Sequence, residues 1–154
     1  MNLRELREAA GLTMSAAAAE AGVSTSTISH AERGRMIDGE RAPANLSLKT
    51  VTTLLRVYGE ERTADMLDGV PTALKPLRER QGLSRAELAD AAEAPGIYTA
   101  RAVQAIELGT NKPTVEQLAS FCLVLGHENA GANKIADMLT ELVRPTTRKP
   151  SRVA

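Results

Sequence analysis

Residues 3–13 read Leu3-Arg4-Glu5-Leu6-Arg7-Glu8-Ala9-Ala10-Gly11-Leu12-Thr13, and the pattern returns 71 positions later as Leu74-Lys75-Pro76-Leu77-Arg78-Glu79-Arg80-Gln81-Gly82-Leu83-Ser84. Both stretches follow Leu-basic-x-Leu-Arg-Glu-x-x-Gly-Leu-(Thr/Ser). Self-similarity of this kind is the signature of a repeated structural unit. Two unrelated pairs of helices could look alike by chance, but the number of matched positions makes this alternative improbable. The sequence therefore predicts two copies of one unit, residues 1–69 (the first copy) and residues 70–143 (the second copy).

Each copy continues with a capped, alanine-rich helix. Thr13 and Ser84 are good helix N-caps, and helices are expected over 14–21 and 85–92. Glu87 lies three residues after Ser84, which makes a capping box.

A turn and a second short helix follow in each copy. Gly22 forms the turn of the first copy, whereas the second copy has a longer turn at about 93–98. Gly34 and Gly109 are expected to end the helices that come next. Two further helices close each copy, at 47–59 and 60–67 and at 114–126 and 132–143. With no convincing strand, the predicted fold class is all-α: two tandem five-helix domains joined by a short linker at about 68–73.

The composition agrees with two small helical domains. The chain has 154 residues, enough for two units of about 70. It has one Phe, two Tyr and no Trp, so the core must consist of aliphatic side chains. The single Cys122 lies in an apolar run, which favours a buried thiol and a reducing compartment. No signal-like or membrane-spanning segment is evident, and we expect a cytoplasmic protein of bacterial or phage origin, associated with the nucleoid.

The charge balance does not by itself suggest nucleic acid, because 19 basic and 19 acidic residues cancel. The distribution is more informative. Residues 144–154 hold four basic groups, Arg144, Arg148, Lys149 and Arg152, and no acidic group. This tail is expected to be disordered alone. Its cations could lie on phosphates or enter a minor groove, and an inert solvated terminus is the equal alternative.

No catalytic or metal-binding pattern is present in the sequence. The two histidines, His30 and His127, belong to different copies, and Cys122 has an apolar context. Neither a phosphate-binding glycine loop nor a metal-spaced cluster of Cys and His occurs. We therefore expect no enzymatic activity, no metal and no cofactor.

The first copy has the residues of a helix pair that inserts its second helix into a DNA groove. Ala18, Gly22, Val23 and Ile28 would hold the two helices together, with a positive backbone angle at Gly22. The start of the second helix would then face outward. Its hydroxyl groups can bond phosphates or base edges.

These motifs resemble the Cro/lambda-repressor (XRE) helix-turn-helix family. The resemblance rests on Gly11-Leu12-Thr13, Ala18, Ala21-Gly22-Val23-Ser24-Thr25-Ser26-Thr27-Ile28-Ser29 and Glu32-Arg33-Gly34-Arg35, and it covers residues 3–67 and, more loosely, 74–142. It implies a regulator that binds operator DNA, often of phage or prophage origin, with the third helix of each copy in the major groove. The family usually has Gln at the start of the second helix and Leu within it. This chain has Met14 or Arg85 at the first place, and Ala17 or Leu88 at the second.

Thirteen residues are predicted to contact DNA. They are Ser24, Thr25, Ser26, Thr27, Ser29, His30, Arg33, Arg35, Arg41, Arg85, Thr99, Arg101 and Gln104. Ser24 is equally a purely structural N-cap, and His30 could be an ordinary solvated histidine. Arg35 and Arg41 belong to the extra loop at about 36–45, which either follows the phosphate backbone or is a mobile solvent loop.

The role of the second copy has alternatives. Arg101 could pair with guanine and Gln104 with adenine. The longer turn could instead re-aim the helix, leaving a degenerate unit that serves packing or dimerisation. The chain would bind double-stranded operator DNA either as a homodimer or as a monomer with two reading units. A different class of function is an antitoxin or protein-interaction module in which the second copy binds a partner protein.

Overall fold

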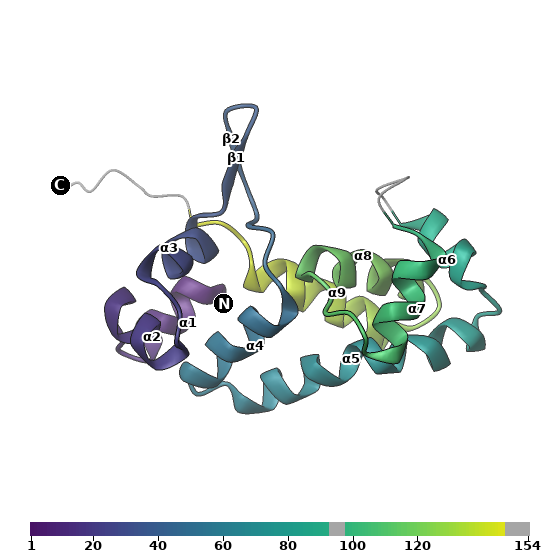
Figure 1. The fold of residues 1–154 in the computed structure, drawn as a ribbon, viewed down its shortest axis with the longest axis horizontal. Coiled ribbons are helices and arrows are strands. Elements are labelled where there is room, and N and C mark those ends of the chain that lie inside the picture. Colours follow the sequence, from purple (N-terminus) through teal and green to yellow (C-terminus); the bar gives the residue numbers. More distant parts are fainter. Residues whose placement is uncertain (93–97, 147–154) are drawn as a thin grey trace.

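The computed structural model describes residues 1–92 and 98–146, and these ranges form nine helices and one two-stranded hairpin (Figure 1). The helices are α1 (Leu3–Ala9), α2 (Met14–Ala21), α3 (Thr25–Arg33), α4 (Leu48–Val57), α5 (Glu61–Arg80), α6 (Arg85–Ala91), α7 (Ala100–Leu108), α8 (Val115–Leu125) and α9 (Ala130–Leu142). The strands are β1 (Arg35–Ile37) and β2 (Glu40–Ala42). The chain is thus mostly helical, as predicted.

The helix starts follow the capping residues that the sequence supplies. The side chains of Thr13, Ser24 and Ser47 each accept a hydrogen bond from the backbone N–H three residues later. The capping box of Ser84 and Glu87 is confirmed. Each such bond satisfies a backbone donor that the first turn of a helix leaves free. These local signals fix where α2, α3, α4 and α6 begin, whereas α5 begins after Glu60 without a side-chain cap.

The core is aliphatic and continuous through the described chain. Ile28, Leu55, Leu67 and Leu118 are fully buried, and Phe121 is the largest side chain among them. Cys122 is 1% exposed, and burial raises the pKa of its thiol to about 12. The prediction of a buried thiol is therefore confirmed.

The predicted linker at 68–73 is wrong, because these residues lie inside α5. This helix of 20 residues carries Pro71 and Pro76 in its interior and runs beneath both copies along the bottom of Figure 1. Its buried apolar residues keep the three- and four-residue spacing of one helical face; they are Ala64, Leu67, Val70, Pro71 and Leu74. Packing along this face outweighs the local preference of Gly69 and Pro71 for a break.

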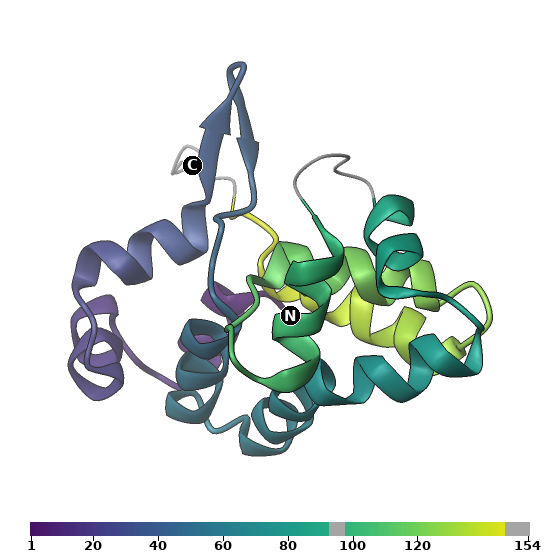
Figure 2. The same ribbon diagram turned by 45° about the vertical axis from the view of Figure 1, so that its right-hand side comes forward.

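The expectation of a helical chain without strands is also wrong at one place. The segment predicted as a loop at 36–45 begins with an antiparallel hairpin in which Arg35 pairs with Ala42 and Ile37 with Glu40. Asp38 and Gly39 form its turn with φ values of 51° and 81°, the positive angles that a two-residue hairpin turn requires. The hairpin projects from the body between α3 and α4 (Figure 2).

The two predicted copies meet at positions that match in the sequence comparison. Ser47 and Thr114, the N-caps of α4 and α8, form an antiparallel bridge. The N–H of Leu48 donates to the carbonyl of Pro113 at 2.9 Å, and the N–H of Val115 donates to the carbonyl of Leu46 at 2.8 Å. Leu46 and Leu48 occupy the positions in the first copy that Pro113 and Val115 occupy in the second. Each of the two hydrogen bonds is therefore the counterpart of the other. The contact is therefore a local two-fold relation between equivalent segments.

Candidate nucleic-acid interface

Helices α2 and α3 are joined by the tight turn that the sequence predicts. Gly22 ends α2 with φ 72° and ψ 31°, in the left-handed region, as predicted. Ala18 is 4% exposed and Ile28 is fully buried, so both lie in the contact that holds the pair together. Val23 is half-buried and packs against the same core. The arrangement presents the opposite face of α3 to solvent.

The outer face of α3 carries polar side chains. Thr25, Ser26, His30 and Arg33 are exposed, whereas Thr27 and Ser29 are half-buried. The hydroxyl of Ser24 accepts the N–H of Thr27 at 3.1 Å and lies 2.9 Å from the Thr27 hydroxyl. Ser24 therefore has a structural capping role, and the exposed residues are the ones free to meet a ligand.

The only carboxylate of α3, Glu32, is turned inward. It is 2% exposed and accepts hydrogen bonds from Arg7 on α1, from Nε at 2.6 Å and from a terminal nitrogen at 3.0 Å. Arg7 also donates to the carbonyl of Leu12 at 2.8 Å, which fixes the turn after α1. The hydrogen bond to Glu32 raises the pKa of the Arg7 guanidinium despite the opposing effect of burial. This pair orients α3 and removes a negative charge from its outer face.

The second copy repeats this buried ion pair. Arg78 donates to Glu107 at 2.7 Å and 3.2 Å, and to the carbonyl of Leu83 at 2.8 Å. Arg85 adds a third bond to Glu107 at 3.0 Å. Burial alone raises the pKa of the Glu107 carboxyl, but hydrogen bonds from Arg78 and Arg85 outweigh it and hold that pKa below its ordinary value.

Arg85 is one of the predicted DNA contacts, and the structure places its guanidinium against Glu107 with the side chain 33% exposed. Met14 occupies the equivalent position of the first copy and is half-buried. The extra arginine is thus a second support for α7, and its contact with DNA remains a prediction.

Helix α7 presents a different face from α3. Thr99 is its N-cap and accepts the N–H of Ala102 at 3.1 Å, while Arg101 and Gln104 are exposed. Leu108, at the place that Arg33 occupies in the first copy, is 60% exposed. Most of the predicted long turn, residues 93–97, lies outside the described residues.

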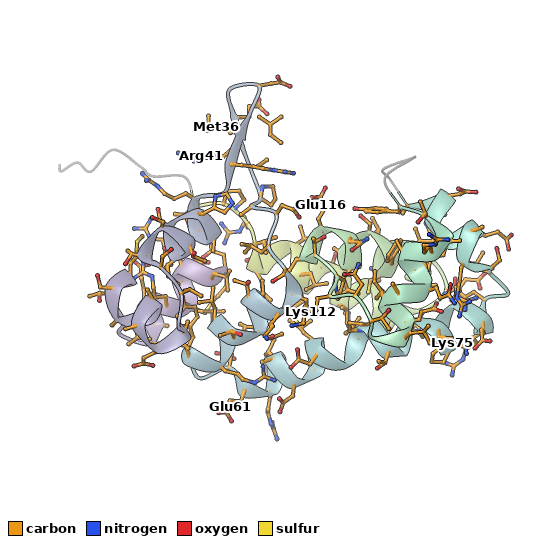
Figure 3. The ribbon with its side chains drawn as sticks, in the orientation of Figure 1. Met36, Arg41, Glu61, Lys75, Lys112 and Glu116 are labelled. Carbon is orange, nitrogen blue, oxygen red and sulfur yellow. The ribbon has the colours of Figure 1, made fainter. Side chains whose placement is uncertain are left out.

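The hairpin places Arg35 and Arg41 beside the C-terminal end of α3, and it also carries Asp38 and Glu40. Arg41 is exposed and donates to the carbonyl of Arg33 at 3.5 Å. It pairs across the strands with Met36, which is 56% exposed, and both lie on the projecting hairpin in Figure 3. Arg35 is half-buried and lies 3.5 Å from Glu116 on α8. The structure therefore brings Arg33, Arg35 and Arg41 to one end of α3.

Sequence reasoning missed Arg4 and Thr146, which line a shallow depression together with Ser29 and Arg33. The periodicity of α1 places Arg4 on a solvent face, but nothing local indicates that this face adjoins α3. Thr146 follows the second copy in the sequence and could not be assigned to the first. Within the described ranges, no group of three or more potential metal ligands occurs, and no helix has the length and apolarity to cross a membrane.

Residues 1–65 match a family model described as a helix-turn-helix domain. The matched range contains α1 to α4, the start of α5 and the hairpin. A domain of this family suggests a DNA-binding regulator. No curated protein and no solved structure matches the chain.

Proposed function

We propose that this protein is a sequence-specific regulator that binds double-stranded DNA, a repressor of the phage or prophage immunity type. One observation carries the proposal. The outer face of α3 offers Thr25, Ser26 and His30 to solvent, while the helix's one carboxylate is buried against Arg7. A polar face without negative charge, on the second helix of a helix-turn-helix, suits the major groove.

Each exposed side chain has a role that its chemistry allows. The hydroxyl groups of Thr25 and Ser26 hydrogen-bond base edges, and the methyl group of Thr25 contacts a thymine methyl. Arg33 and Arg41 neutralise phosphates at the other end of α3, where they fix the register of the helix in the groove. Base contacts thus determine specificity, and the arginines contribute affinity that depends on salt.

The second copy supplies a second reading helix in this proposal. Arg101 and Gln104 are exposed on α7 at neighbouring turns. Arg101 reads a guanine and Gln104 an adenine, each by paired hydrogen bonds. Because α3 and α7 present different residues, the two half-sites differ. One chain then binds one non-palindromic site.

The decisive experiment is selection of bound sequences from a random duplex pool at moderate salt, followed by mass determination of the selected complex. The proposal expects one enriched motif without internal symmetry, bound by a single chain. A palindrome bound by two chains would remove the second reader from the proposal. No enrichment at all would refute sequence-specific binding.

Point variants separate the two readers on the selected site. Thr25→Ala combined with Ser26→Ala should abolish discrimination in one half of the motif, and Arg101→Ala should cost about 1–3 kcal/mol in the other half. Thr72→Ala and Arg62→Ala, at exposed positions of α5, are the matched controls and should leave both halves unchanged. An unchanged footprint for Arg101→Ala would refute the second reader.

A second candidate is an antitoxin-type protein in which the second copy binds a partner protein. The exposed Leu108 on α7 favours it, since an isolated large apolar side chain on a recognition face suits a protein contact better than a phosphate. This candidate predicts that the chain co-purifies with a small basic protein in stoichiometric amount. Leu108→Arg should abolish that association and leave DNA selection by α3 intact.

A further inference from the structure

A hollow lies where the two copies meet, between α4, α5 and the turn that follows α7. Its volume is about 400 Å³, and its lining comes from the first copy, from the second copy and from the helix that connects them. Lys112, labelled in Figure 3, lines this hollow, and so does Lys49 at the start of α4. Hollows of this volume accept small organic ligands.

The two lysines of the hollow lie close enough to repel each other. Contact with the amino group of Lys49, and repulsion between the two charges, lower the pKa of Lys112, and no described carboxylate opposes this effect. Arg56 also lines the hollow, but it bonds Asp65 at 2.9 Å and Asp68 at 2.6 Å, which balance its charge. Neither lysine forms an ion pair with a described residue. The uncompensated charge of the hollow is therefore positive and belongs to Lys49 and Lys112.

The backbone adds positive polarity at the same place. Lys49 is the second residue of α4, and the N-terminus of this helix meets the segment that carries Lys112. The N–H of Lys49 has no acceptor among the described residues, whereas its neighbour Leu48 donates to the carbonyl of Pro113. Free N–H groups in the first turn of a helix attract anions. The helix end and the two ammonium groups thus favour the same kind of ligand.

The inner side of the hollow is apolar. Leu48, Pro71, Ile106 and Pro113 line it, and all four are buried in the surrounding core. A hydrated inorganic ion gains little beside such a lining, whereas an organic body packs against it and excludes water. The hollow therefore fits a ligand that has an apolar part and an anionic group.

We propose that this hollow binds a small organic phosphate monoester, with the phosphate between Lys49 and Lys112 and the organic part against Leu48 and Ile106. A phosphate monoester carries a charge of about −2 near neutral pH, which matches two ammonium groups. A carboxylate would match one of them. The bound ester contacts both copies and stabilises the arrangement in which the structure holds them. This inference goes beyond the proposed function and does not depend on it.

Phenyl phosphate is a probe that carries both parts of the expected ligand. Calorimetric titration of the full chain should show one site per chain, with tighter binding than that of inorganic phosphate, benzoate or phenol. Lys49→Gln and Lys112→Gln should each weaken the binding about tenfold or more, the scale of one charge-assisted hydrogen bond. The matched control Lys75→Gln/Lys134→Gln removes two exposed lysines of α5 and α9 and should leave the affinity unchanged.

Urea unfolding gives a second measurement that also shows whether the variants fold. Both lysines are exposed, and Lys112→Gln removes one of two charges that repel each other, so its urea midpoint without ligand should equal or exceed that of the parent. Phenyl phosphate should raise the midpoint of the parent and of the control, and should raise that of Lys49→Gln/Lys112→Gln much less. Equal ionic strength in all samples removes the contribution of general screening.

The outcomes separate this site from the proposed function. The proposal is wrong if phenyl phosphate does not bind, or binds no more tightly than inorganic phosphate. Undiminished binding by the lysine variants would also overturn it, because the ligand would then lie elsewhere. If the parent ignores phenyl phosphate but Lys49→Gln/Lys112→Gln loses affinity for the selected duplex, the two lysines contact DNA phosphates and the small-molecule site is refuted. Failure to select any duplex refutes the proposed function alone.

Discussion

Truncation of Glu107 to Ala should destabilise the protein more than any other single change at its two buried ion pairs. The carboxylate accepts two hydrogen bonds from Arg78 and one from Arg85. Its side chain is fully buried, and that of Arg78 is 8% exposed. Removal of Glu107 leaves the charge of Arg78 buried without a partner. Glu32 in the first copy holds one arginine, so the loss there should be smaller.

Glu107→Ala should lower the free energy of unfolding by about 3–5 kcal/mol, the range for removing one partner of a buried ion pair. For a chain of this length each kcal/mol lowers Tm by about 2–4 °C, which gives a decrease of about 6–20 °C. Arg85→Ala leaves the bonds between Arg78 and Glu107 in place and removes a side chain that is 33% exposed. It should cost about 1 kcal/mol or less.

Urea unfolding followed by far-ultraviolet circular dichroism measures both variants, since the chain has no Trp to report by fluorescence. The double variant Arg78→Met/Glu107→Leu is the control for burial without charge, and it should recover most of the loss. A free energy for Glu107→Ala within about 0.5 kcal/mol of the parent, the scale of a surface substitution, would refute the reasoning.

Three further outcomes follow from named contacts. The pKa of the Glu107 carboxyl is lower in the folded protein than its ordinary value, so ionised Glu107 stabilises the fold above that ordinary value. This stabilisation is lost as the pH falls below about 4.3. On acidification the urea midpoint should therefore fall further for the parent than for Arg78→Met/Glu107→Leu. Tyr58→Phe should leave the urea midpoint unchanged or raise it, since the buried Tyr58 hydroxyl has no hydrogen-bond partner among the described residues. Gly22→Ala should cost about 1–2 kcal/mol in the free energy of unfolding, because only the left-handed backbone opposes it. Gly34→Ala should cost more, because its Cβ would lie 2.0 Å from the carbonyl oxygen of Ala42. Equal costs at the two glycines would contradict this account.

Structural features that are determined by neighbouring residues could be predicted from the sequence. The cap at Ser24, the left-handed Gly22 and the capping box at Ser84 each depend on residues within four positions of one another. The buried face of α3 follows from helical spacing alone, and Ile28 lies on it. The part of the candidate site that lies on α3 is of this kind, because Thr25, Ser26 and His30 share one helix.

The features that the sequence did not predict depend on contacts between distant segments, or on local signals that favour two structures equally. The continuation of α5 through Gly69 and Pro71 is decided by core packing on both sides of it, which no local window contains. The hairpin was signalled by Asp38-Gly39, but its strands of three residues are too short to show alternation. The bond from Thr146 to Glu32 joins residues more than a hundred positions apart.

The contact between the copies bears on how a two-reader protein would behave. In a dimer of separate chains, the spacing of the two readers is lost when the dimer dissociates on dilution. Here α5 connects the copies covalently, and the bridge of Ser47 with Thr114 sets them in a two-fold relation. Under the proposed function, no association step precedes binding. The titration of the selected duplex should therefore follow a single-site curve at all protein concentrations. A curve that steepens, or an affinity that falls on dilution below a threshold concentration, would show that a second chain is required.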